Sequence, residues 1–157
     1  MISHFYTHPS PKKIRYRKKD PQRHIVYKME REIIGNAVDT FVPLDKLQGI
    51  ADHACRKAGV RRIVINAYAS AEKVFGYVQC GQLYLNKNYH GHNTSVLLHE
   101  LAHHITDEQN GGECEDHGPT FLWTYRELLD SYKILPTVCF DALTKKHGLI
   151  VHAYCGV

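Results

Sequence analysis

The chain has 157 residues, 43% of them hydrophobic, and a formal net charge of +4 at pH 7. This length suits one ordinary domain with a hydrophobic core, and no run approaches the roughly 18 apolar residues of a membrane span. The first residues lack the apolar stretch of a secretory signal, so we expect a cytoplasmic protein that does not associate with membranes.

The positive charge is concentrated near the N-terminus. Residues 12–23 hold seven Lys/Arg and one acid, whereas the rest of the chain carries 13 Lys/Arg and 15 Asp/Glu. Residues 1–19 are polar and contain Pro9 and Pro11. This composition predicts a flexible basic arm ahead of one domain over residues 20–157. Such an arm could bind nucleic acid, although a solvated tail or a protein partner would also explain it.

Two helices are expected at the start of the domain. Asp20 and Pro21 are typical of an N-cap and a first helical position, and apolar residues then recur at helical spacing until Gly35. A second amphipathic helix is predicted over 43–58, with Gly59 at its C-terminal end.

Three short runs with strand character follow, and then three more helices. The strand candidates are 63–65, 74–78 and 83–85, and the last two are joined by residues 79–81, which suggests a hairpin. A helix capped by Asn93 or Thr94 should end at Gly111-Gly112. Further helices should begin at Pro119 and span about 136–146, and residues 149–151 could add a strand. Together these elements predict an α+β fold, with a small sheet packed on helices.

The cysteines lie at positions 55, 80, 114, 139 and 155. Their number is odd and no two form a C-x-x-C pair. This pattern favours reduced thiols over a disulfide framework or a cysteine-based zinc site.

The strongest motif is H-E-x-x-H at residues 99–103. His99 and His103 are four residues apart, so on a helix they share one face and can bind one metal ion. Three neutral imidazoles would hold Zn²⁺ and leave a position open for water. Glu100 would then act as the general base that takes the proton of the zinc-activated water.

A third metal ligand must come from outside this helix, and His117 is the preferred candidate. It follows the Gly111-Gly112 break. Glu127 is the alternative, because some zinc peptidases take a glutamate from the next helix. The acids between the motif and His117 are further ligand candidates, although such acids are more simply solvated or hydrogen-bonded to the ligand imidazoles. They are Asp107, Glu113, Glu115 and Asp116.

If the motif belongs to a zinc peptidase, two further features are expected near it. The strand at 83–85 precedes the motif helix, where zinc peptidases usually place the edge strand that binds extended substrate. An oxyanion-stabilising side chain should also lie near the metal, and the candidates are Tyr125, Tyr132, His152 and Tyr154.

The segments His99–His103 and His117–Phe121 together resemble SprT-like (Spartan-type) zinc metallopeptidases. The layout from Asp20, Gln22 and Arg23 onwards is also similar to small metallohydrolases of actinobacteria and their phages. The resemblance implies a zincin-like fold, a protein or peptide substrate, metal binding by the three histidines and Glu100 as the catalytic base. Spartan-type proteins also carry a zinc ribbon with paired cysteines, whereas none of the cysteines in this sequence forms a C-x-x-C pair.

The sequence therefore predicts a zinc-dependent metallopeptidase that uses His99, His103 and His117 as ligands and Glu100 as general base. Two alternatives stay open. One is a zinc-stabilised nucleic-acid-binding module without proteolytic activity, and the other is a metal hydrolase that cleaves a non-peptide bond.

Overall fold

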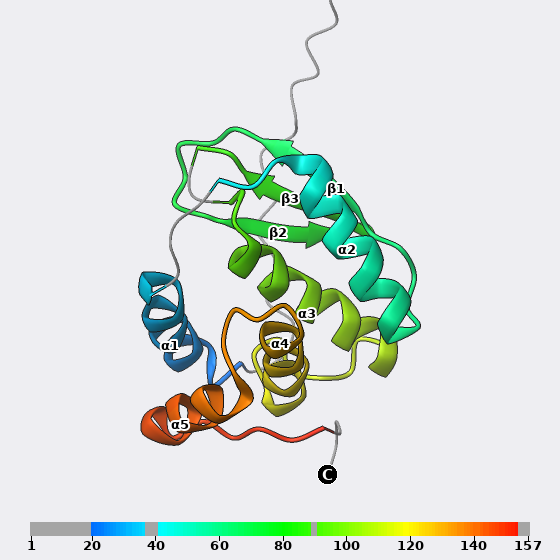
Figure 1. Ribbon diagram of the computed structural model, residues 1–157. Coiled ribbons are helices and arrows are strands. Elements are labelled where there is room, and N and C mark those ends of the chain that lie inside the picture. The colour runs from blue at the N-terminus through cyan, green and yellow to red at the C-terminus, as the bar shows by residue number, and fades with distance from the viewer. Residues whose placement is uncertain (1–19, 37–40, 89–90, 154–157) are drawn as a thin grey trace, which may run out of the picture.

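The computed structural model describes residues 20–36, 41–88 and 91–153, and these residues form an α+β fold of five helices and one three-stranded sheet (Figure 1). The predicted basic arm, residues 1–19, lies outside the described residues. The helices are α1 (Arg23–Asn36), α2 (Leu44–Ala58), α3 (Thr94–Asn110), α4 (Pro119–Ser131) and α5 (Thr137–His147). The strands are β1 (Val64–Tyr68), β2 (Gly76–Gln79) and β3 (Gln82–Asn86).

The helix ends follow the local sequence at most positions. Helix α2 follows Pro43 and ends at Gly59, whose φ of 69° is the left-handed conformation that glycine adopts without strain. Helix α1 differs from the expectation, because it begins at Arg23 and not at Pro21. The backbone N–H of Arg23 donates to the carbonyl of Asp20 at 3.4 Å. The Asp20 carboxylate is used elsewhere, as described below.

The sheet has the order β1-β3-β2. Strands β2 and β3 form the expected antiparallel hairpin, whereas β1 runs parallel to β3. The two turn residues, Cys80 and Gly81, have φ values of 51° and 71°, as a tight two-residue hairpin requires. The expectation that residues 83–85 form an edge strand is wrong: β3 is central, and the sheet edges within the described chain are β1 and β2.

Helix α3 lies in the middle of the structure, between the sheet and α4 (Figure 1). Leu97, Leu98 and Leu101 on α3 are fully buried, as are Leu83 and Leu85 on β3. This apolar surround fixes the orientation of α3, and therefore of any polar side chain that it carries. None of the described helices combines the length and the apolar character needed to cross a membrane.

The segment after α5 does not form the additional strand that was expected at residues 149–151. It is held by a side chain instead. The Gln22 Oε1 atom accepts a hydrogen bond from the backbone N–H of Ile150 at 2.8 Å. The Gln22 amide also donates to the carbonyl of His117 at 3.3 Å. Gln22 therefore ties the C-terminal segment and the loop before α4 to the start of α1.

Candidate metal centre

Helix α3 presents two histidine side chains side by side. The Asn93 side chain caps the helix by accepting the Ser95 N–H at 2.7 Å, and Gly111 ends it with a φ of 64°. Between these ends, His99 and His103 are one helical turn apart, and their Nε2 atoms lie 3.1 Å from each other. Two nitrogens of a tetrahedral zinc site are about 3.3 Å apart, given zinc–nitrogen bonds of 2.0–2.1 Å.

His117 completes the group from the loop that joins α3 to α4. Its ring centroid lies 5.3 Å from that of His99 and 4.7 Å from that of His103. One ligand atom from each of the three imidazoles lies within 4.8 Å of the other two. The structure therefore brings together all three histidines that the sequence singled out, and this group could hold a metal ion.

Two carboxylates from the start of the domain hold the outer nitrogens of these rings. The Nδ1–H of His117 donates to Asp20 Oδ2 at 2.6 Å, and the Nδ1–H of His99 donates to Glu30 Oε1. Each carboxylate fixes the tautomer of its imidazole and leaves the Nε2 lone pair free for a metal. The Nε2 atom of His117 is buried and has no hydrogen-bond partner. An ion at this point would satisfy it, so the donor set fits a metal.

The sequence leads us to expect that the acids of the loop before His117 are either solvated or hydrogen-bonded to the ligand imidazoles, and neither Asp20 nor Glu30 is among them. The carboxylates that contact the rings come from Asp20 and from Glu30 on α1. From its sequence context alone, Asp20 is expected to be a helix cap. For Glu30 a signal was present: Val26, Glu30 and Ile33 share the inward face of α1 and are all at most 8% exposed. An acid on the apolar face of a helix indicates a buried partner.

The protonation of the rings follows from burial and from these partners. Burial lowers the pKa of His103 well below its ordinary value, and the neighbouring His99 and His117 act in the same direction. Burial also lowers the pKa of His117, although Asp20 opposes it. For His99 burial is outweighed by the charge of Glu30 and its hydrogen bond, so its pKa is raised. His103 and His117 are therefore neutral at pH 7, as metal ligands must be.

Glu100 lies next to His99 on α3, and only 9% of its surface is exposed. Burial raises the pKa of its carboxyl to about 7; His99 opposes this shift and Glu30 adds to it. Gly76 at the start of β2 lies against its side chain, since a Cβ atom at Gly76 would be 3.5 Å from Glu100 Cγ and 2.8 Å from the carbonyl of Tyr84. Because residue 76 is glycine, α3 can approach the edge strand closely.

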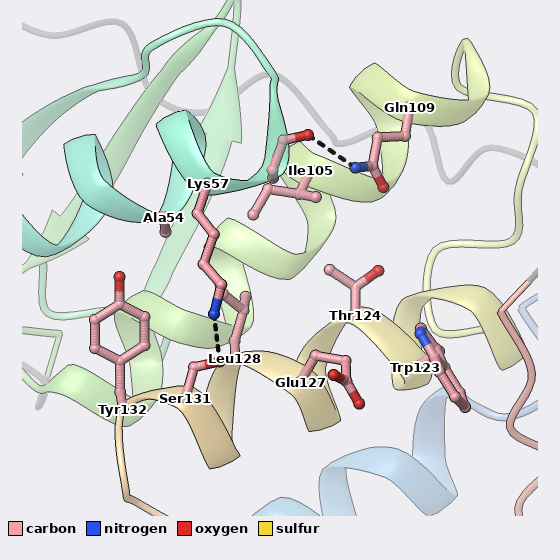
Figure 2. A pocket seen from close by; sticks show the side chains of 11 residues that line it. Ala54, Lys57, Ile105, Gln109, Trp123, Thr124, Glu127, Leu128, Ser131 and Tyr132 are labelled. Atoms are coloured by element: carbon pink, nitrogen blue, oxygen red, sulfur yellow. Dashed lines mark hydrogen bonds between the residues drawn. The ribbon is translucent and has the colours of Figure 1, made fainter.

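The other ligand candidates are not part of the three-histidine group. Glu127 lies on α4 beside a hollow of about 240 Å³ that α2, α3 and α4 line together (Figure 2). Its carboxylate accepts a hydrogen bond from Arg126 at 2.8 Å. The four loop acids, likewise, do not belong to the metal-binding group found among the described residues.

The structure describes three of the four residues that the sequence offered as oxyanion stabilisers. Tyr125 is fully buried behind His99, with the ring centroids 5.6 Å apart. Tyr132 lines the hollow in Figure 2 and donates its hydroxyl hydrogen bond to the carbonyl of Ile50 at 3.2 Å. Tyr154 lies outside the described residues. His152 donates its backbone N–H to the Pro119 carbonyl at 3.3 Å.

The expectation that the cysteines are reduced thiols is wrong for one of them. Cys114, in the loop that leads to His117, is disulfide-bonded. Cys55, Cys80 and Cys139 are free, as expected. The spacing of the cysteines could not indicate this bond, because a disulfide depends on the distance between two side chains in the folded chain.

Comparisons with family models, with curated proteins and with solved structures give no match.

Proposed function

We propose that this chain is a zinc-dependent metallopeptidase with a zincin-like fold, of the SprT-like type that its motifs resemble. The observation that carries the proposal is the convergence of three imidazoles beside a buried glutamate. His99, His103 and His117 offer three nitrogen ligands within 4.8 Å, and Glu100 is on the same helical turn as His99. Three histidines with one open position are the ligand set of catalytic zinc.

A structural metal site explains this arrangement less well. Structural zinc is almost always bound by four protein ligands, whereas the group found in the described part of the chain has three. A buried carboxylate beside the ligands would also carry a desolvation cost without a role. Both features favour a catalytic centre over a zinc-stabilised binding module.

The chemistry can be assigned to named side chains. A bound zinc ion would supply Lewis acidity, which polarises a carbonyl and makes water acidic near neutral pH. Glu100 accepts the proton of the attacking water and later delivers it to the leaving amine. Burial raises the pKa of the Glu100 carboxyl above its ordinary value, which makes the carboxylate a stronger base for this step. Asp20 and Glu30 keep the ligand rings in the required tautomer.

The sheet edge supports a peptide as the substrate. Strand β2 is at the edge of the described sheet, and its first residue, Gly76, lies against Glu100. An extended polypeptide that paired with β2 would pass close to the general base. In this proposal the substrate pairs with β2, and not with the strand at 83–85 that the sequence suggested.

The test is hydrolysis of an unfolded protein by the full chain. Zinc-loaded wild type and Glu100→Gln are incubated with β-casein, with and without single-stranded DNA, because the basic arm could bind it. We expect Glu100→Gln to keep one zinc per chain and to lose roughly 10³-fold in rate, since an amide cannot accept the proton. Glu127→Gln is the matched control and should cleave like wild type.

Two results would contradict the proposal in different ways. Wild-type turnover by zinc-loaded Glu100→Gln would exclude Glu100 as the base. A zinc-loaded wild type that cleaves a p-nitrophenyl ester or phosphodiester but no polypeptide would make the chain a hydrolase of non-peptide bonds.

A further inference from the structure

A tyrosine on α1 lies at the metal centre although no motif includes it. The ring centroid of Tyr27 is 5.0 Å from that of His117 in an edge-on arrangement, and 6.3 Å from that of His99. Tyr27 is 37% exposed, whereas Phe121 and Tyr125, which also contact the histidines, are fully buried. Among the described aromatic residues at the centre, Tyr27 therefore combines contact with the ligands and access from solvent.

Arg23 places a positive charge beside Tyr27. The guanidinium carbon of Arg23 lies 5.5 Å from the centre of the Tyr27 ring. A guanidinium group can only donate hydrogen bonds, so Arg23 does not accept the phenol proton. The ordinary pKa of a tyrosine phenol is about 10, so its O–H is present at neutral pH and can donate a hydrogen bond.

The placement follows from helical spacing on α1. Arg23, Tyr27 and Glu30 are four and three residues apart, so they share one face of the helix. Glu30 on this face is anchored to His99. The anchor fixes the rotation of α1 and thereby holds Tyr27 beside the ligands.

We propose that Tyr27 is the catalytic residue that donates a hydrogen bond to the oxyanion formed when water attacks the substrate carbonyl. This inference rests on the proposed peptidase function. In the step, a C–O bond forms and the carbonyl π electrons move to oxygen. Glu100 takes the proton of the water and passes it to the amine as the C–N bond breaks. Tyr27 keeps its proton throughout and stabilises the negatively charged oxygen through this hydrogen bond. The positive charge of Arg23 beside Tyr27 adds to the stabilisation.

The test uses Tyr27→Phe, which removes one oxygen atom and keeps the ring. We expect kcat for β-casein to fall roughly 10²-fold with KM nearly unchanged, because the hydrogen bond forms in the transition state. Binding of a phosphonamidate dipeptide, whose tetrahedral phosphorus mimics that state, should weaken roughly 10- to 100-fold by calorimetry. Affinities for zinc and for acetohydroxamate, a planar metal ligand, should not change. Tyr132→Phe is the matched control, and its kcat should equal that of wild type.

The outcomes separate this inference from the proposed function. If wild type cleaves casein and Tyr27→Phe does so equally well, Tyr27 is not the oxyanion donor and the peptidase proposal stands. If zinc-loaded wild type neither cleaves a polypeptide nor binds the phosphonamidate, both proposals fail. A large loss of zinc affinity in Tyr27→Phe would instead make the tyrosine a metal ligand and overturn the inference.

Discussion

Helix α3 supplies two of the three ligand imidazoles, whereas Asp20 and helix α1 supply the carboxylates that hold two of the three rings. Helix α3 carries His99 and His103, whose Nε2 atoms face each other at 3.1 Å. Helix α1 carries Glu30, which binds the other ring nitrogen of His99, and Asp20 just before α1 does the same for His117. Glu30 and His99 are 69 residues apart in the chain, and Asp20 and His117 are 97 residues apart.

The histidines bind the metal, whereas the carboxylates orient the histidines. Loss of a ring on α3, or of His117, removes a bond to the metal, whereas loss of a carboxylate at α1 leaves every ligand present but less firmly oriented. The two regions should therefore differ in the size of their effects, and the following predictions test that difference.

The largest effect is expected from His117→Ala. Removing one of three ligands should reduce zinc affinity by several orders of magnitude, far beyond the roughly 10- to 100-fold that a supporting residue contributes. Competition with a chromogenic chelator measures it, with Glu127→Gln as control. If His117→Ala retained wild-type zinc affinity, the third ligand would have to come from another residue. His117 could then not be distinguished from a residue that only orients a ligand.

An intermediate effect is expected from Asp20→Asn and Glu30→Gln. Each variant keeps the shape of the side chain but weakens the bond that orients an imidazole, so zinc affinity should fall roughly 10- to 100-fold. Glu32→Gln is the matched control on α1, because Glu32 pairs with Lys146 at 2.9 Å at the surface. Equal zinc affinities for all three variants would show that α1 does not support the ligands.

The smallest effect is expected on the pH dependence of hydrolysis, because Glu30 on α1 influences the pKa of Glu100 on α3. Glu100 must be ionised to act as a base, so casein hydrolysis at saturating zinc should decline as pH falls through the pKa of this group. That pKa is about 7 in the structure, and a bound dication lowers it, so the midpoint should lie at or below 7. Glu30 helps to raise this pKa. Glu30→Gln should therefore shift the acid limb of the kcat profile to lower pH, and a shift to higher pH would contradict the assignment.

The sequence by itself determined the parts of this protein that depend on neighbours in the chain. The spacing of His99 and His103 needs only helical geometry, and a helix over 94–110 follows from the Asn93 cap, the apolar residues and Gly111. The hairpin at Cys80 and Gly81 is equally local. His117 could be named as a candidate because few residue types bind zinc and it follows a helix break.

Only the tertiary structure decided which side chains surround the metal centre from a distance. Asp20 has the local features of a helix cap, yet its carboxylate binds His117, 97 residues away. Tyr27 has no local feature that separates it from other tyrosines, and β3 became central because β1 pairs with its far side. These outcomes depend on how α1 and β1 pack against the rest of the fold. Packing joins residues by their positions in space, which helical and strand periodicity do not encode.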